Sequence, residues 1–116
     1  MQKNIFLIAI IALISFSAQS SDKQEQNRTL CELVSVNSSA SVTEVLKKLN
    51  IDLSEALSST RCYGKDIIMF SDFIGFEKTG SNLLALASTE ELNYYQNRIH
   101  NSEMQKKIIE LLSNNN

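Results

Sequence analysis

The sequence predicts an all-α fold, a small bundle of about four to six short helices closed by one disulfide. Proline is absent and glycine occurs only three times in 116 residues, so the chain has few forced breaks. Apolar residues recur at the i, i+3 and i+4 spacing of amphipathic helices. The two cysteines can form one covalent bridge, which would help a domain too small for a large core.

The first segment, residues 1–20, has the three parts of a cleavable secretory signal peptide. Lys3 lies at the start, an apolar run of about ten residues follows, and small residues end the segment. We expect cleavage between Ser20 and Ser21. The alternative is a retained membrane anchor, but a bilayer span needs roughly 20 apolar residues. The segment therefore predicts an exported protein, periplasmic or extracellular, without stable membrane insertion after cleavage.

The remaining chain is long enough for one domain. Residues 21–27 are polar and have no apolar periodicity, so we expect an unstructured lead-in there. Residues 28–87 are expected to form a disulfide-closed helical domain. Residues 88–116 should add a C-terminal helix or helix pair.

Three helices are expected between the two cysteines. The first covers about 30–36, and the second, over 41–49, has apolar residues at i, i+3, i+4 and i+7. Ser41 and Glu44 stand in the order of a capping box at the start of the second helix. A shorter third helix is expected over 53–57.

The middle of the chain predicts a turn followed by a helix. Gly64 suits a turn with positive φ, and Asp66 is placed to cap a helix over 67–74. Ile68 and Phe73 are expected to widen the buried face of this helix. The alternative is a strand, because Ile-Ile-Met-Phe is a β-friendly run, but strict alternation of polar and apolar residues is missing.

The last part of the chain is expected to contain a turn at 79–80, a short helix over 83–87 and one long helical segment. Ser88 and Glu91 form a second capping-box pattern at the start of that segment. Its apolar stripe slips near Asn101, so either one long helix bends there or two helices meet.

Cys31 and Cys62 are expected to pair, because an exported chain with two cysteines reaches an oxidising compartment. The bridge would close a loop of about 30 residues and stabilise the fold by about 3–4 kcal/mol. Two alternatives are weaker. A redox dithiol would favour a Cys-x-x-Cys spacing, and a zinc site would need a fourth ligand besides the cysteines and His100. We therefore expect no metal and no other cofactor.

Several short motifs follow one another in a recognisable order: Leu30-Cys31, Cys62-Tyr63-Gly64, Ile67-Ile68, Phe70 and Thr79-Gly80. With these motifs the chain resembles an uncharacterised bacterial family of small exported proteins, a domain-of-unknown-function family. The resemblance implies the disulfide and an exported bacterial protein, and it implies no activity. One position departs from the pattern, since the resemblance leads us to expect Asn where Tyr63 stands.

No pattern in the sequence indicates a catalytic site. His100 is the only histidine and suits a surface or helix-end position, and Glu90 and Glu91 point in different directions on a helix. Tyr95 belongs to an apolar stripe, which leaves Tyr94 as a candidate surface contact. The formal net charge is −2 and the basic residues are scattered, so we expect no binding to nucleic acid.

We therefore expect a non-enzymatic binding or interaction module of the bacterial periplasm or envelope. Its partner would be an unknown protein or envelope component, and the sequence does not specify the oligomeric state. One alternative is a small secreted enzyme whose site is not visible in the sequence. The other is an exported toxin or membrane-active domain, against which the acidic net charge argues.

Overall fold

The structure is a computed structural model that describes residues 24–36 and 39–114. The predicted signal peptide and its cleavage site at Ser20 and Ser21 lie outside the described residues. Within the described ranges the protein is all-helical, as expected, with seven helices instead of the four to six that we expected. They are an N-terminal helix over 24–35, α2 (Ser39–Lys48), α3 (Leu53–Ser59), α4 (Ile67–Ile74), α5 (Glu77–Leu84), α6 (Thr89–Gln96) and α7 (Ser102–Asn114).

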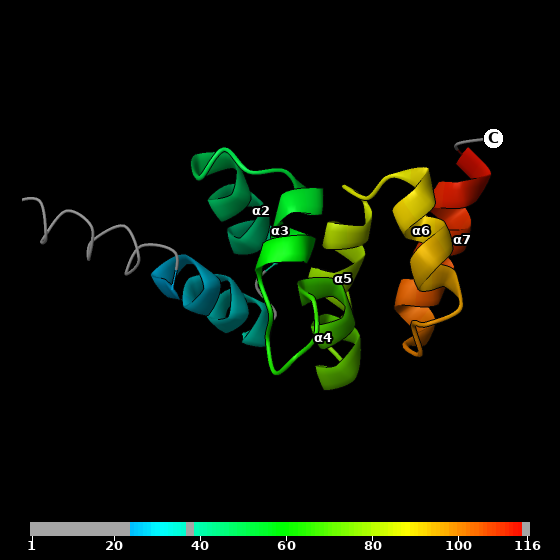
Figure 1. The fold of residues 1–116 in the computed structure, drawn as a ribbon. Coiled ribbons are helices and arrows are strands. Elements are labelled where there is room, and N and C mark those ends of the chain that lie inside the picture. The colour runs from blue at the N-terminus through cyan, green and yellow to red at the C-terminus, as the bar shows by residue number, and fades with distance from the viewer. Residues whose placement is uncertain (1–23, 37–38, 115–116) are drawn as a thin grey trace, which may run out of the picture.

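The helices are arranged around α4 and α5 (Figure 1). The N-terminal helix, α2 and α3 lie on one side of this central pair, and α6 and α7 lie together on the other. α5 packs against α2, α4 and α7, and α6 packs against α7. Every helix contributes buried apolar side chains to one core, among them Leu30, Val34, Val42, Leu46, Leu53, Ala56, Ile67, Ile68, Phe70, Leu83, Leu84, Leu92, Tyr95, Met104 and Ile108.

The predicted bridge is present. Cys31 Sγ and Cys62 Sγ are 2.05 Å apart, and the two Cα atoms are separated by 5.6 Å. The bond joins the N-terminal helix to the turn before α4 and confirms the pairing expected from the cysteine count.

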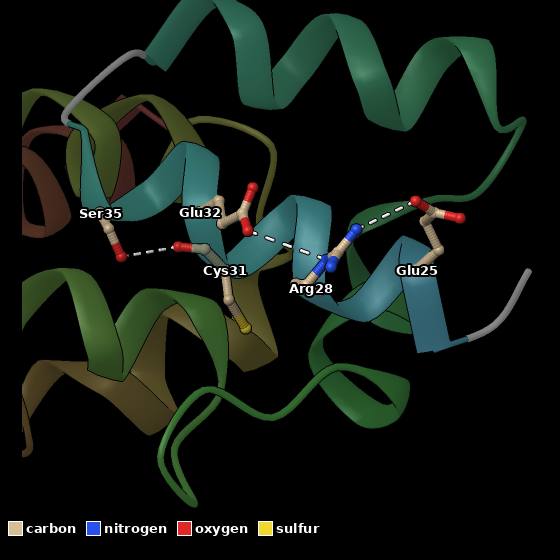
Figure 2. Close-up of polar contacts among 5 residues, drawn as sticks. All are labelled: Glu25, Arg28, Cys31, Glu32 and Ser35. Atoms are coloured by element: carbon tan, nitrogen blue, oxygen red, sulfur yellow. Dashed lines mark hydrogen bonds and ion pairs between the residues drawn. The ribbon is translucent and has the colours of Figure 1, made fainter. Parts of the chain in front are cut away.

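Charged side chains lie along one side of the N-terminal helix (Figure 2). Arg28 Nη2 is 3.0 Å from Glu25 Oε1, and Arg28 Nε is 3.8 Å from Glu32 Oε1. These side chains are between 65 and 70% exposed, so each pair adds at most about 1 kcal/mol. The Cys31 side chain points away from them in Figure 2. The disulfide and the buried apolar residues therefore hold this helix in place.

The N-terminal helix begins earlier than we expected, since residues 24–27 are helical and do not form an unstructured lead-in. Asn27 explains part of the difference. Its Oδ1 accepts a hydrogen bond of 3.0 Å from the Arg61 backbone N–H, and its Nδ2 donates one of 3.5 Å to the Arg61 carbonyl. A long-range contact of this kind leaves no periodic signal in the sequence.

The second helix was predicted correctly, but its N-terminus was not. α2 begins at Ser39, so Ser41 lies in the first turn and is not the N-cap of the expected capping box with Glu44. Val42 and Leu46 are buried as expected, whereas Leu49 lies beyond the end of α2 and is 41% exposed.

α4 is a helix, not a strand, and Asp66 caps it as predicted. Asp66 Oδ1 accepts a 2.8 Å hydrogen bond from the Met69 backbone N–H. Ile68 is buried, but the expectation that Phe73 is buried is wrong, because Phe73 is 70% exposed. At about 100° per residue, the buried arc runs from Phe70 through Ile67 to Ile68, and Phe73 falls outside it.

The expected turn at 79–80 and helix over 83–87 are wrong, because α5 runs through 79–80 and ends at Leu84. Gly80 is buried at the contact with α7. A Cβ atom built on Gly80 would overlap the Sδ and Cε atoms of Met104. The glycine therefore permits close helix packing here, and does not mark a turn. Leu86, beyond the helix, is 50% exposed.

The C-terminal segment consists of two helices, α6 and α7, and not of one bent helix. Ser88 and Glu91 form the predicted capping box at the start of α6. Asn101 Oδ1 accepts a 3.0 Å hydrogen bond from the Met104 backbone N–H at the start of α7. The slip in the apolar stripe near Asn101 thus marks a helix boundary.

Candidate interaction surface

A two-residue turn links the disulfide to α4. Cys62 N–H donates to the Lys65 carbonyl at 2.8 Å, and Lys65 N–H donates to the Cys62 carbonyl at 3.1 Å. Between them Tyr63 has φ +54° and Gly64 has φ +80°. Positive φ at both central residues is the geometry of a type I′ turn, which strongly favours Asn-Gly. This turn geometry explains why asparagine would be favoured at position 63. The tyrosine that stands there adopts a backbone conformation that costs about 1–2 kcal/mol.

The strained residue presents an aromatic ring to solvent. Tyr63 is 89% exposed, yet its ring stacks on the ring of Phe70 with centroids 5.7 Å apart and planes inclined by 29°. Phe70 itself is buried in the core. The turn and the stack together place the Tyr63 ring beside Phe70 and leave most of it accessible.

A second exposed ring lies on α4. Phe73 is 70% exposed, and Lys65 Nζ lies 4.9 Å from its ring centroid. This distance is within the range of a cation–π interaction. We call Tyr63, Lys65, Phe70 and Phe73 together the Tyr63–Phe73 surface. It combines two accessible rings with one positive charge, a composition that suits recognition more than folding.

The Tyr63–Phe73 surface forms no ion pair within the described part of the chain. The two nearby carboxylates on α4 and at its N-cap are used elsewhere. Asp66 receives the cap hydrogen bond of α4 and a 2.8 Å hydrogen bond from the Tyr95 hydroxyl. Asp72 accepts hydrogen bonds from the backbone N–H groups of His100, at 3.0 Å, and Asn101, at 2.7 Å.

Asp66 and Asp72 therefore have structural roles that the sequence did not reveal, namely to attach α6 and the α6–α7 connection to α4. Tyr95 is buried, as predicted, and is 2% exposed. Burial, and next the negative charge of Asp66, raise the pKa of the Tyr95 hydroxyl. The folded protein therefore stabilises the neutral form of the Tyr95 hydroxyl.

Tyr94 is 49% exposed, in agreement with its predicted surface position. The Arg98 guanidinium carbon lies 3.9 Å from its ring centroid, and Arg98 Nη1 donates a 2.6 Å hydrogen bond to the Tyr94 carbonyl. Arg98 therefore covers one face of this ring. A role of Tyr94 in binding stays a prediction.

The remaining polar candidates do not come together. His100 is exposed, and its backbone N–H is bound to Asp72. Glu91 accepts hydrogen bonds from the Ser88 backbone N–H and from the Ser54 hydroxyl, each with a different carboxylate oxygen. It thus joins α6 to α3. No group of three His, Cys, Asp or Glu side chains that could hold a metal ion occurs among the described residues.

The solvent-open depressions on the described surface include two that are lined mainly by polar residues. One has a volume of about 450 Å³ and is lined by Glu77, Lys78, Ser81, Asn82 and Glu103. The other, of about 230 Å³, is lined by Gln26, Asn27, Ile51, Glu55, Ser59 and Thr60. Neither contains a cysteine or a histidine, and neither includes a residue of the Tyr63–Phe73 surface. No helix in the described part of the chain is long and apolar enough to cross a bilayer.

Comparison of the chain with protein families, curated proteins and solved structures found no match in any of the three. The candidate site therefore rests on the geometry of this chain. Sequence reasoning missed it because Phe73 was assigned to the core. One signal was available, namely tyrosine directly before Gly64, where a tight turn favours asparagine.

Proposed function

We propose that the protein is an exported, non-enzymatic binding module of the bacterial periplasm or envelope, and that it contacts a protein partner through the Tyr63–Phe73 surface. The observation that carries the proposal is Tyr63 itself. Its ring is 89% exposed while its backbone has φ +54°. A bulky residue in a costly conformation is retained when its side chain is needed at that place, and sites of this kind gather at functional surfaces.

The export part of the proposal is supported by the sequence of residues 1–20 and by the disulfide. The apolar run and small residues of that segment suit a signal peptide, and Cys31–Cys62 is a bond that persists in oxidising compartments. The binding part is supported by aromatic exposure. Tyrosine and other aromatic residues are enriched at the centres of protein interfaces.

We propose no catalytic role. The two depressions described above show no hydrogen bond between a nucleophile and a side-chain base, and the carboxylates of Asp66, Asp72 and Glu91 already accept structural hydrogen bonds.

The test is photo-crosslinking of the full chain in its native cells. A photoreactive phenylalanine analogue replaces Phe73 in one protein and Ile109, which is 56% exposed on α7, in the matched control. We expect a discrete adduct from position 73 that excess unlabelled protein suppresses. The same excess of a variant carrying Tyr63→Ala should not suppress it. Identical adducts from both positions, or equal competition by the variant, would refute the proposed surface.

A further inference from the structure

We infer that the Tyr63–Phe73 surface recognises a peptide segment in which one acidic side chain lies next to an aromatic side chain. This inference rests on the proposed function, because it names the chemistry of the partner at the same surface. It follows from the charge of Lys65, from the free faces of the two rings and from their spacing.

The charge of Lys65 points to an anionic group. Lys65 Nζ contacts the Phe73 ring and has no carboxylate partner in the described ranges. Asp66 and Asp72, the acidic residues nearest to it in sequence, are held by Tyr95 and by the α6–α7 connection. An incoming carboxylate can therefore pair with Lys65 without displacing an existing ion pair. A cationic partner is disfavoured, because Lys65 already contacts the Phe73 ring and would repel it.

The rings point to an aromatic neighbour of that carboxylate. The Tyr63 ring centroid lies 5.7 Å from that of Phe70, and at 89% exposure most of the Tyr63 ring is open to solvent. Aromatic side chains pair favourably at centroid distances of about 4.5–7 Å, so a ring from the partner can pack on Tyr63. The contact with Phe70 favours one orientation of the Tyr63 ring, and a favoured orientation lowers the entropic cost of binding.

The spacing of the two contacts fits neighbouring residues of a partner. Phe70, beneath Tyr63, and Phe73, beside Lys65, are three residues apart on α4 and thus about one helical turn apart, roughly 5 Å along the axis. Consecutive Cα atoms of a peptide are about 3.8 Å apart, and in a turn or another non-extended backbone the side chains of adjacent residues can lie on the same side. One acidic and one aromatic side chain on adjacent residues can therefore reach Lys65 and Tyr63 together.

The net charge of the chain does not prevent Lys65 from binding a single acidic group. The protein carries a formal charge of −2, so Lys65 is a local positive site on an acidic molecule. At physiological ionic strength interactions between exposed charges are screened beyond about 8 Å, which permits a single carboxylate to bind.

The test uses the oxidised protein and three blocked dipeptides, with binding followed by amide chemical shifts in NMR spectra. The first probe is acetyl-Glu-Phe-amide, the second replaces its Glu by Gln, and the third is acetyl-Gln-Phe with a free terminal carboxylate. We expect shifts around Tyr63, Lys65 and Phe73, with the first probe binding roughly two- to fivefold more tightly than the second. The K65M variant, which keeps an unbranched apolar stem, should remove that difference, while the matched K48M variant at an exposed lysine on α2 leaves it unchanged.

Three results would overturn the inference. Equal binding of the first two probes would show that the carboxylate is not recognised. Tighter binding of the third probe than of the first would assign the surface to a chain terminus. Shifts confined to other residues, or none at all, would show that the surface does not take this ligand. The photo-crosslink from position 73 distinguishes failure of this inference from failure of the proposed function. If an adduct forms but no dipeptide binds, the proposed function stands and only this partner chemistry is rejected.

Discussion

Tyr63 shows how one residue can be unfavourable for folding and informative about function. Its backbone has φ +54° in a turn that suits asparagine, whereas its ring gains a stack on Phe70. The two effects are similar in size, since an aromatic pair adds about 0.5–1.5 kcal/mol. A single substitution of Tyr63 would therefore change the backbone cost and the ring stack together.

Comparison of Tyr63→Asn with Tyr63→Ala isolates the backbone effect, because neither variant carries the ring. We expect the Asn variant to unfold with a free energy about 1 kcal/mol higher than the Ala variant, since asparagine tolerates the left-handed region. Urea denaturation of both proteins in the oxidised form measures the difference. Equal stability would mean that the turn does not require positive φ at this position.

The Tyr95 hydroxyl donates a part-buried hydrogen bond from α6 to Asp66 at the start of α4. The Tyr95→Phe variant keeps the ring and removes only the hydroxyl that donates to Asp66 Oδ2 at 2.8 Å. We expect the free energy of unfolding near pH 7 to fall by about 1.5–3 kcal/mol, because the acceptor is charged. Tyr94→Phe, on the exposed neighbouring ring, should change it by less than about 0.5 kcal/mol.

The same pair predicts a pH dependence with a defined sign. The pKa of Tyr95 is raised in the folded protein, so its hydrogen bond contributes fully below the ordinary tyrosine pKa of about 10. Above that pH the unfolded chain loses its proton first, and the contribution falls as pH rises. In urea titrations from pH 8 to pH 11, the stability gap between the native protein and Tyr95→Phe should narrow above pH 10. A constant gap would contradict the raised pKa.

Among the helices, α5 shows most clearly that local sequence patterns are not sufficient to predict where a helix begins and ends. Its neighbours α4 and α6 were predicted from apolar spacing and from caps at Asp66 and Ser88, which are local signals. The position of Gly80 inside α5 depends on Met104, 24 residues later in the chain. A glycine that permits close packing and a glycine that forms a turn look alike until the partner helix is placed.

Gly80→Ala should destabilise the protein by about 1–3 kcal/mol, because the new methyl group overlaps a fully buried Met104 side chain. In a Met104→Ala background the same substitution should instead stabilise α5 by about 0.5–1 kcal/mol, since alanine favours a helix more than glycine does. A double-mutant cycle in urea measures both values. The same effect of Gly80→Ala in both backgrounds would show that the two residues do not interact.

Phe73 shows why the candidate site was missed in the sequence analysis. The periodicity located α4 correctly, but a stripe of Ile and Phe residues does not say how wide its buried arc is. The helix buries Ser71, whose hydroxyl donates to the Ile67 carbonyl at 2.8 Å, and leaves Phe73 outside. The Tyr63–Phe73 surface became visible only when the packing of α4 was known.

At the scale of the whole molecule, the disulfide joins the N-terminal helix to the middle of the chain. Cys31 and Cys62 are 31 residues apart, and the chain-entropy contribution of a loop of this size is about 3–4 kcal/mol. Replacement of both cysteines by serine should lower the free energy of unfolding by that amount. Urea titration with a reductant should shift the native protein toward the variant and leave the variant unchanged. An unchanged midpoint of the native protein would show that the bridge contributes little.

The proposed function requires that this chain is exported and works in an oxidising compartment as a covalently closed binding module. The intact mass of the protein recovered from the cell envelope and the medium, before and after reduction and alkylation, tests this directly. We predict a chain that begins at Ser21 and is lighter than its dithiol form by the two hydrogens lost at Cys31 and Cys62. A full-length chain with both thiols free for alkylation would contradict the account.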